Sequence, residues 1–334
     1  MNAARIETMI LSPQNRPTRR CHAVTLAETP SGLIAAWFGG QIESASDSGI
    51  WLARQSAAGW SRPVEIIAGP SGSQGGDADS ICYRYIAPYP CWNPVLFKPR
   101  EGALLLFYKV GRSPRLWQGW LTRSSDDGQT WCEPCPLGDS AIGALLGPVK
   151  NKPVQRPDGV ILCPSSTESR EWRTHIEATR DMEHWEVFGP VDDPNRLGAI
   201  QPTLLSLPDG RMLMVCRTKH RIIARSESSD GGQTWSPLAP TALNNPNSGI
   251  DAVTLNDGRL LLVYNDSDCA RTPLVAAISE DGEHWRNTLT LEDGPGEYSY
   301  PAVIQSANGK VHIAYTWRRQ GIGYAVIEPA KAAS

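Results

Sequence analysis

The chain has 334 residues and a formal net charge of −3, so it lacks the basic balance of a nucleic-acid-binding protein. No run of 18 apolar residues occurs, which argues against a membrane-spanning helix. The first 20 residues contain no apolar stretch long enough for a secretory signal. We therefore expect a cytoplasmic protein without nucleic-acid or membrane partners, with a trimmed secretory signal as the alternative. The sequence does not indicate an oligomeric state.

In chain order, the sequence repeats one unit in which a glycine-containing turn precedes an apolar run. Examples are "PSGLIAAWF" at 30–38 and "NDGRLLLVY" at 256–264. The turn glycines are Gly32, Gly102, Gly159, Gly210, Gly258 and Gly309, and the last four are spaced by 51, 48 and 51 residues. A glycine turn before a β-rich run is typical of a hairpin.

A second series of phrases lies between these turns and ends in tryptophan. Residues 124–131 read "SSDDGQTW" and residues 228–235 read "SSDGGQTW", with shorter versions at 279–285, 179–185 and 55–60. Ser, Asp and Gly close turns through hydrogen bonds from side chain to backbone, and the tryptophan packs between neighbouring sheets. We interpret these phrases as architecture rather than chemistry.

Each unit has room for four strands in about 40 to 50 residues, the size of one propeller blade. We therefore predict an all-β fold, a six-bladed β-propeller of four-stranded antiparallel blades that occupies residues 1–334 as a single domain. The sixth unit has no tryptophan phrase, so we expect the N-terminal "RIETMIL" at 5–11 to complete it and close the ring. Residues 66–90 do not fit the repeat and predict a surface insertion, which is a candidate lid.

The chain has eight cysteines but no metal-binding pattern, because the CxxC of Cys132 and Cys135 has no partner pair at zinc-ligand spacing. Without a secretory signal we expect unbridged thiols, and Cys82 with Cys91 is the alternative pair. No phosphate-binding loop, dinucleotide fingerprint or HExxH motif occurs. We expect no cofactor and no metal, although a divalent ion held by scattered carboxylates is left open.

In a four-stranded meander, the first and third turns lie at the same end of the blade. Here the first turn is the glycine turn and the third is the tryptophan phrase. The start of the innermost strand, the end of the second strand and the loop after it lie at the other end. Counting from the turn glycines places the following polar and aromatic residues at that end: His22, Trp92, Asn93, Gln201, Ser248, Ser299, Tyr300, Lys152, Lys109, Arg217, Asn265, Asp47, Glu43 and Arg271.

These residues predict an anion-binding pocket on the ring axis. Lys109, Lys152, Arg217 and Arg271 would attract an anion, and the planar Arg forks suit a carboxylate. Trp37, Trp92 and Trp117 would offer apolar faces to a sugar ring. Alternatively, polar residues at strand ends are a solvated rim.

The tryptophan phrases resemble the Asp-box of the sialidase superfamily, Ser-x-Asp-x-Gly-x-Thr-Trp, which occurs twice intact and three times in degraded form. The resemblance covers nearly the whole chain and is specific for the propeller fold, whereas Asp-boxes also occur in propellers that are not sialidases. In a sialidase, three arginines hold the substrate carboxylate, a tyrosine activated by a glutamate is the nucleophile, and an aspartate is the acid/base.

Carried over by position, the resemblance implies Arg217 and Arg271 as the second and third arginines. The acid/base falls on Asp47 in "ESASDSG". The nucleophile falls on Tyr298 or Tyr300 in "GEYSYPAVIQ": the count to Gly309 favours Tyr300, and the local "YS" favours Tyr298.

Two positions depart from the sialidase pattern. His22 occupies the place of the first arginine, and Gln201 occupies the place of the glutamate that activates the tyrosine. An amide does not accept a proton from a phenol as a carboxylate does. His22 is a candidate general acid or base, or alternatively a histidine that forms a hydrogen bond to the next blade.

We therefore predict a carbohydrate-active enzyme, a sialidase-like exo-glycosidase that acts on the anionic terminus of a glycan. The first alternative is a uronate-directed polysaccharide lyase or a rhamnosidase-type enzyme that uses His22. The second alternative is a lectin-like propeller that binds an acidic sugar without turnover. The partner in all three cases is an anionic oligosaccharide.

Overall fold

Every predicted turn glycine joins two antiparallel strands. The computed structural model describes residues 6–71 and 85–329, and all regular elements in these ranges are β-strands. The six turn glycines have φ values from 82° to 123°, a backbone region that residues with a Cβ atom rarely adopt. Within the described part of the chain, no helix is long and apolar enough to cross a membrane.

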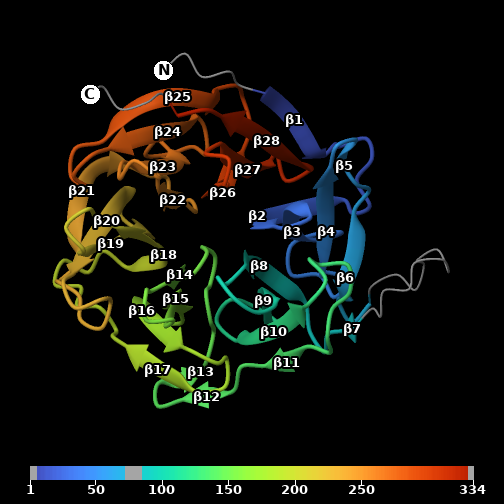
Figure 1. The fold of residues 1–334 in the computed structure, drawn as a ribbon, viewed down its shortest axis with the longest axis horizontal. Helices are drawn as coiled ribbons and strands as arrows, with labels where there is room; N and C mark the ends of the chain where they lie inside the picture. The colour runs from blue at the N-terminus through green and yellow to red at the C-terminus, as the bar shows by residue number, and fades with distance from the viewer. Residues whose placement is uncertain (1–5, 72–84, 330–334) are drawn as a thin grey trace.

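The strands form six sheets, numbered here as blades 1 to 6, that stand around a central axis (Figure 1). Blade 1 contains β2 (Arg20–Thr29), β3 (Gly32–Gly40), β4 (Gly49–Ser56), β5 (Gly59–Trp60), β6 (Val64–Ala68) and β7 (Tyr85–Ile86). Blade 2 contains β8 (Cys91–Phe97), β9 (Leu104–Val110), β10 (Gln118–Ser124) and β11 (Cys135–Pro136). A small hairpin of β12 (Asp139–Ser140) and β13 (Gly143–Ala144) follows.

Blade 3 contains β14 (Val154–Gln155), β15 (Ile161–Glu168), β16 (Trp172–Thr179) and β17 (Trp185–Phe188). Blade 4 contains β18 (Ala199–Ser206), β19 (Met212–Thr218), β20 (Ile222–Ser228) and β21 (Ala239–Asn244). Blade 5 contains β22 (Asp251–Thr254), β23 (Leu260–Asn265), β24 (Leu274–Ser279) and β25 (Arg286–Glu292). Blade 6 contains β26 (Tyr298–Gln305), β27 (Val311–Trp317), β28 (Gly321–Ile327) and β1 (Ile6–Leu11).

The N-terminal strand closes the ring as predicted. In Figure 1, β1 lies beside β28 at the outer edge of blade 6, and its register pairs Thr8 with Tyr324. The outer strand of the last blade therefore comes from the start of the chain. This pairing removes the open sheet edge that blade 6 would otherwise expose.

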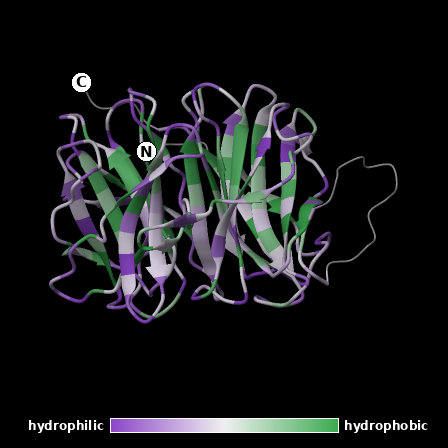
Figure 2. Ribbon diagram, turned by 90° about the horizontal axis from the view of Figure 1, so that it is seen from below, coloured by the Kyte–Doolittle hydropathy of each residue, from purple (hydrophilic) through white to green (hydrophobic). Residues whose placement is uncertain are grey.

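The core lies between the blades, because the inner strands of each sheet are covered on both faces. Strand β19 is buried along its whole length, and so is β23. Figure 2 shows this from the side: hydrophobic residues fill the strands, and hydrophilic residues gather in the loops at the two ends. Such continuous apolar runs are what a strand buried on both faces requires.

The Asp-box phrases pack the blades that carry them against the preceding blade. In blade 2, Thr130 donates hydrogen bonds from its backbone N and its Oγ1 to Asp126, and the backbone N of Gly128 donates to Oγ of Ser124. Burial alone would raise the pKa of Asp126, but these hydrogen bonds lower it to about 2. Gly128 lies against Ile34 of blade 1. The repeated phrase therefore has a structural role, as predicted.

Contacts between loops show which turns share an end of the ring. Nη1 of Arg156, before the glycine turn of blade 3, donates to the backbone O of Gly231, in the Asp-box of blade 4. The glycine turns and the Asp-boxes therefore lie at the same end. The starts of the innermost strands lie at the opposite end.

Of the segment 66–90, which we predicted to be a surface insertion, the structure describes the two ends. Its first residues complete β6, the outer strand of blade 1, and Tyr85–Ile86 pairs in parallel with β6. Residues 72–84, and with them Cys82, lie outside the described residues. The cysteines at described positions, including the buried Cys91, are free thiols.

Candidate active site

The innermost strands carry the same irregularity where they begin. In β2, β8, β18 and β26 the pairing register shifts near the start of the strand. The shift falls on a residue with positive φ: Ala23 (54°), Asn93 (36°), Gln201 (52°) and Tyr300 (53°). A bulge of this kind re-aims side chains, and non-glycine residues in this region are typical of functional sites.

These residues lie nine positions before the turn glycine of their blade. The same count gives Lys150 in blade 3 and Gly249 in blade 5. A Cβ atom on Gly249 would lie 3.1 Å from Cγ of Tyr300 and 3.3 Å from Cε of Lys150. The missing side chain in blade 5 thus leaves room for those of Tyr300 and Lys150 near the axis.

Tyr300 is at the centre of the site. Its phenol oxygen accepts a hydrogen bond of 2.7 Å from Nη1 of Arg217, which also donates to Oε1 of Gln201 at 3.2 Å. Nε and Nη2 of Arg217 form a fork on Oδ1 of Asn247, at 2.9 and 2.7 Å. The guanidinium of Arg271 stands 5.4 Å from the centroid of the Tyr300 ring. Two arginines therefore face one phenol.

His22 packs against Tyr300, with ring centroids 4.0 Å apart. Its Nδ1 lies 3.0 Å from Oγ1 of Thr316 in blade 6, and its Nε2 is buried without a hydrogen-bond partner in the described structure. Burial, followed by the charges of Arg319, Arg271, Arg217 and Lys150, holds the pKa of His22 well below 6.5. His22 is therefore a neutral imidazole at pH 7. Nδ1 thus has the contact with the neighbouring blade that we gave as one alternative for His22. Nε2 is left as the candidate acid or base, a role that stays a prediction.

Glu297 joins two arginines beside this pair. Its carboxylate accepts from Nη1 of Arg271 at 2.7 Å, from Nε of Arg319 at 3.1 Å and from Oγ of Ser299 at 2.9 Å. Burial alone would raise the pKa of Glu297, but the two guanidiniums hold it below its usual value. Arg319 also pairs with Glu43.

Glu168, at the end of β15, brings a second carboxyl group to the site. Its Oε1 accepts a hydrogen bond of 3.2 Å from Nε2 of Gln201, whose Oε1 is bonded to Arg217. Burial raises the pKa of Glu168 above 4.5, opposed by the charge of Arg217 and the Gln201 hydrogen bond. A chain of hydrogen bonds therefore links Glu168 through Gln201 and Arg217 to Tyr300.

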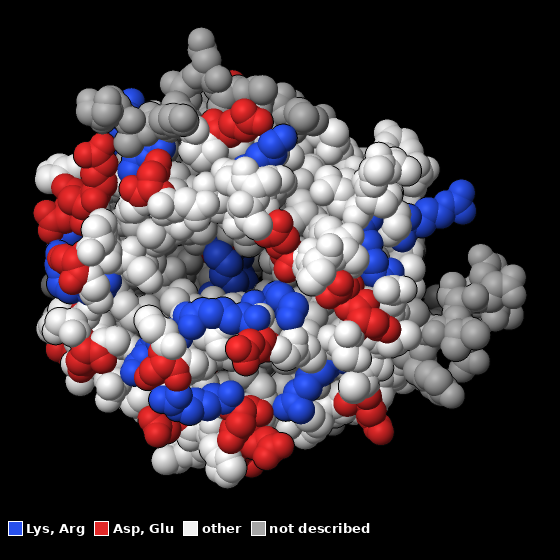
Figure 3. Space-filling view, in the orientation of Figure 1, with Lys and Arg blue, Asp and Glu red and all other residues white. Residues whose placement is uncertain are grey.

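Two lysines tie the blades together at the axis. Nζ of Lys150 donates to the backbone O of Ile250 in the fifth unit and to that of Pro301 in blade 6. Nζ of Lys152 lies 3.0 Å from Oδ1 of Asp251 and donates to the backbone O of Ala252. Lys152, which we expected to bind an anion, is thus neutralised by Asp251. Figure 3 shows a hollow at the ring axis with basic side chains inside it and on its rim.

Several predicted contacts lie in the protein interior. Trp37 and Lys109 have no exposed surface, and Nζ of Lys109 donates to the backbone O of Pro148. Trp92 and Trp117 are buried and pack edge to face, 6.1 Å apart. In this structure these four residues are therefore not in a position to hold a sugar. Trp37, Lys109 and Trp92 lie on second or innermost strands, which are covered on both faces, and Trp117 immediately precedes β10.

Of the two candidate tyrosines, Tyr300 contacts the axial residues and Tyr298 lies in the core between blades 5 and 6; the nucleophile role stays a prediction. The hydroxyl of Tyr298 contacts Arg318 and the backbone O of Pro295, within the core between blades 5 and 6. Only Tyr300 contacts His22 and Arg217.

The remaining predicted residues surround this centre. Asn93 is buried at the bulge of β8, and the buried Oγ of Ser248, beside Gly249, has no partner in the described structure. Oδ2 of Asp47 accepts from the backbone N of Gln41, and its buried Oδ1 has no partner there. Asp47 forms no hydrogen bond with Tyr300 or Arg217, so its acid/base role stays a prediction.

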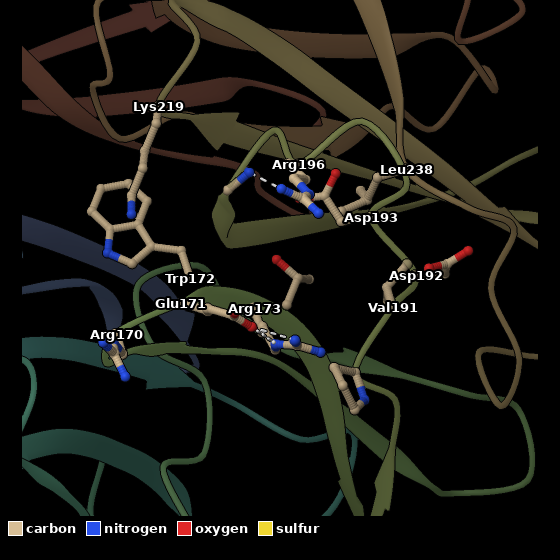
Figure 4. A pocket seen from close by; sticks show the side chains of 13 residues that line it. Arg170, Glu171, Trp172, Arg173, Val191, Asp192, Asp193, Arg196, Lys219 and Leu238 are labelled. Carbon is tan, nitrogen blue, oxygen red and sulfur yellow. Dashed lines mark hydrogen bonds and ion pairs between the residues drawn. The ribbon is translucent and has the colours of Figure 1, made fainter.

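Two cavities open beside the axial residues. One, of about 370 Å³, is lined by His22, Phe38, Glu43, Glu297 and Arg319. The other, of about 610 Å³, lies between blades 3 and 4 and includes Trp172, whose ring centroid is 5.7 Å from the Arg217 guanidinium (Figure 4). The described residues contain no cluster of three or more His, Cys, Asp or Glu arranged to hold a metal ion.

Sequence reasoning missed Lys150, Glu168, Trp172 and Arg319. The count of nine residues before Gly159 would have found Lys150 instead of Lys152. Glu168 ends the second strand of its blade at nearly the position that gave Arg217 in the next blade. Arg319 lies in the turn between β27 and β28, for which the repeat gives no signal.

A family model described as a BNR repeat-like domain matches residues 31–313. No curated protein matches the chain. Among solved structures, the chain is similar to the Hadza microbial sialidase Hz136, with a TM-score of 0.79, 17% identity and coverage of 97% of this chain and 68% of that one. The intramolecular trans-sialidase from Ruminococcus gnavus gives 0.71 and 14%, covering 93% of this chain and 95% of that one. An α-L-arabinanase from Penicillium chrysogenum gives 0.67 and 17%, covering 98% and 99%. At these identities the similarity establishes a fold shared with glycosidase propellers.

Proposed function

The chain belongs to the family of BNR repeat-like domains, and on that premise we propose that it is an exo-glycosidase that removes a carboxylate-bearing sugar from the end of a glycan. The observation that carries the proposal is the Tyr300 phenol near the ring axis. It is hydrogen-bonded to Arg217 and stacked beside a buried, neutral His22. Sialidases are the glycosidases that use a tyrosine nucleophile.

The first step of the proposed reaction replaces the glycosidic bond by a bond to the tyrosine oxygen. The phenol oxygen of Tyr300 attacks the anomeric carbon while its proton passes to Nε2 of His22, which forms no hydrogen bond within the described structure and belongs to the ring that packs against Tyr300. The bond to the leaving oxygen breaks, and Glu168 supplies the proton that this oxygen takes up. A cation beside the phenol oxygen, here Arg217, stabilises the negative charge that develops as the proton leaves.

The second step restores the enzyme. The Glu168 carboxylate takes a proton from water, the water oxygen attacks the anomeric carbon, and the tyrosine oxygen leaves and regains its proton from His22. This division of roles gives the acid/base work to a carboxyl group with a raised pKa, as such catalysis needs. His22 supplies the base that Gln201 cannot.

The substrate carboxylate would be held by the arginines around Tyr300. Arg217 has no acidic partner in the described structure, and its guanidinium donates hydrogen bonds to Asn247, Gln201 and Tyr300. Arg271 and Arg319 share Glu297. Arginine forks bind carboxylates in a bidentate manner, so these three groups favour an anionic terminal sugar.

The experiment is a product assay on 3′-sialyllactose and on a glycan that ends in rhamnose linked to glucuronate, read by mass spectrometry and ultraviolet absorbance. We expect release of free sialic acid from 3′-sialyllactose with addition of one water, whereas release of the neutral rhamnose would contradict the proposed preference for a carboxylate-bearing terminal sugar. Tyr300→Phe should lower kcat by roughly 10³-fold or more, since a covalent nucleophile is lost. Tyr298→Phe is the matched control and should keep kcat, because its hydroxyl contacts only Arg318 and Pro295.

A second candidate function is sugar binding without turnover, which the amide of Gln201 favours. In that case calorimetry would detect binding of the glycan to wild type, and neither substrate would release a product. A product lighter by one water, with new ultraviolet absorbance, would instead mean elimination. Either outcome would contradict the glycosidase proposal.

A further inference from the structure

The cleft between blades 3 and 4 is a second polar cavity outside the axial residues. It has a volume of about 610 Å³, which is in the range of small-molecule sites. Its walls come from the start of β16 and from the loops before β18 and after β19. In Figure 4, Trp172 and Lys219 lie on one side, Arg196 and Asp193 lie across from them, and Arg170 lies near Trp172.

Two acidic side chains of the cleft already form hydrogen bonds or an ion pair within the protein. Both carboxylate oxygens of Asp193 accept backbone hydrogen bonds of 2.9 Å, from Leu197 and Gly198. Glu171 pairs with Arg173. These contacts hold the two loops that form the walls.

Three of the cationic side chains of the cleft lack such contacts. Within the described residues, the side chains of Arg170, Arg196 and Lys219 form no ion pair and no hydrogen bond. The lining as a whole carries four cationic and three acidic side chains, a net charge of +1. Nζ of Lys219 stands 4.5 Å from the centroid of the Trp172 ring. The cleft thus presents an excess of positive charge next to an aromatic ring.

Trp172 connects the cleft to the axial site. The centroid of its ring lies 4.5 Å from Nζ of Lys219 and 5.7 Å from Cζ of Arg217, and Arg217 is bonded to Tyr300. In the hairpin of β15 and β16, Trp172 pairs directly with Glu168. A sugar bound beside Trp172 would therefore have its linking oxygen near both Glu168 and the sugar at Tyr300.

We propose that this cleft binds the sugar on the leaving-group side of the bond, and that this sugar carries an anionic group, a carboxylate or a sulfate. The inference rests on the proposed function, since it places the bond to be cleaved between Tyr300 and the cleft. An aromatic ring flanked by arginine and lysine suits a sugar with an acidic substituent. The raised pKa of Glu168 agrees with a proton donor at the junction.

The kinetic test compares two substrates with the same terminal sugar. One has a 4-methylumbelliferyl leaving group, and the other has a disaccharide leaving group with a sulfate or a carboxylate. Lys219→Gln should raise KM for the acidic substrates by about tenfold, the value of one charge-assisted contact, and leave KM for the methylumbelliferyl substrate unchanged. Trp172→Ala should raise KM for the acidic substrates by more than it changes KM for the methylumbelliferyl substrate. Lys310→Gln, at a glycine turn on the opposite end of the ring, is the control.

The binding test does not depend on turnover. Calorimetry would measure lactose, lactose 6′-sulfate and a glucuronate-containing disaccharide against wild type and Trp172→Ala. We expect wild type to bind the two anionic sugars more tightly than lactose, and Trp172→Ala to lose this preference. If anionic sugars bind but no substrate turns over, the proposed function fails while the cleft assignment stands.

Two results would overturn the inference. One is turnover of all substrates with the same KM in wild type, Trp172→Ala and Lys219→Gln, which would leave the proposed function intact. The other is equal binding of lactose and the two anionic disaccharides, which would remove the role assigned to the charge. A preference for only one of the anionic sugars would identify the acidic group.

Discussion

Nη1 of Arg217 lies 2.7 Å from the phenol oxygen of Tyr300, although 83 residues separate the two in sequence. The bond joins the second strand of blade 4 to the innermost strand of blade 6 across the ring axis. The same guanidinium holds Asn247 and Gln201. Arg217 therefore positions Tyr300, and it is the group nearest the phenol oxygen that carries a fixed positive charge.

Arg217→Lys keeps the charge but removes the fork. A single ammonium cannot hold Asn247, Gln201 and Tyr300 together, so Tyr300 loses its orientation. We expect kcat/KM to fall by roughly 10- to 100-fold, the value of one or two charge-assisted hydrogen bonds. Arg225→Lys, whose guanidinium pairs with Glu283 away from the axis, is the matched control. Equal kcat/KM in both variants would mean that the fork has no role in catalysis.

Gly249→Ala tests the space behind Tyr300. The new Cβ would lie 3.1 Å from Cγ of Tyr300, tighter than ordinary contact, so the ring must shift by a few tenths of an ångström. Small displacements of a reacting group are costly, and we expect kcat to fall by about tenfold with little change in the thermal midpoint. Steady-state kinetics and calorimetric melting measure the two effects. A stable variant with normal kcat would show that the ring position is not critical.

Gly128→Ala tests the packing contact that the Asp-box of blade 2 makes with blade 1. Its φ is +83°, and the added Cβ would meet Cδ1 of Ile34 in blade 1. Gly138→Ala is the matched control, because Gly138 has a φ of +92° but no atom within 4 Å of the new Cβ. Both variants carry the backbone strain, of order 1 kcal/mol. Only Gly128→Ala should lose a further 1–3 kcal/mol, roughly, through overpacking, as measured by denaturant unfolding.

Two buried lysines make stability depend on pH near neutrality. Burial lowers the pKa of Lys109 and of Lys150 from 10.5 to about 7, while Glu177 and Asp251 respectively act in the opposite direction. Above pH 7 the unfolded chain keeps protons that the folded chain releases, so the free energy of unfolding rises with pH. Below pH 7 both states hold these protons, and this contribution to the slope vanishes.

Lys109→Met should remove the share of this slope that belongs to Lys109. At pH 8 we expect the number of protons taken up on unfolding to be smaller by about one than in wild type; the thiols of the unfolded chain also titrate there, but they contribute equally to both proteins. Denaturant unfolding at several pH values measures it. An unchanged slope would mean that Lys109 keeps its proton in the folded state.

The repeat of glycine turns and Asp-boxes was sufficient to predict six blades, the closing strand and the two ends of the ring. These features depend on local rules: positive φ at Gly32 and its equivalents, and hydrogen bonds within the eight residues that contain Asp126. The residues Arg217, Tyr300 and His22 could be proposed from the count because each has a fixed place in its blade. The ends of segment 66–90 pair with blade 1 through contacts that follow no repeat, and its assignment as a surface insertion stays a prediction.

The sequence by itself determined the fold and which end of the ring carries the starts of the innermost strands, because both follow from the order and spacing of the glycine turns and the Asp-boxes. Only the tertiary structure decided which side chains meet there. The bulges in four innermost strands turn Tyr300 rather than Tyr298 towards His22, and they arise from pairing with the next strand. Packing between blades buries Trp37 and Lys109, whereas Glu168, Arg319 and Trp172 reach the site from neighbouring strands and turns. Contacts between distant blades depend on how the six sheets pack around the axis, and the repeat does not encode which side chains meet there.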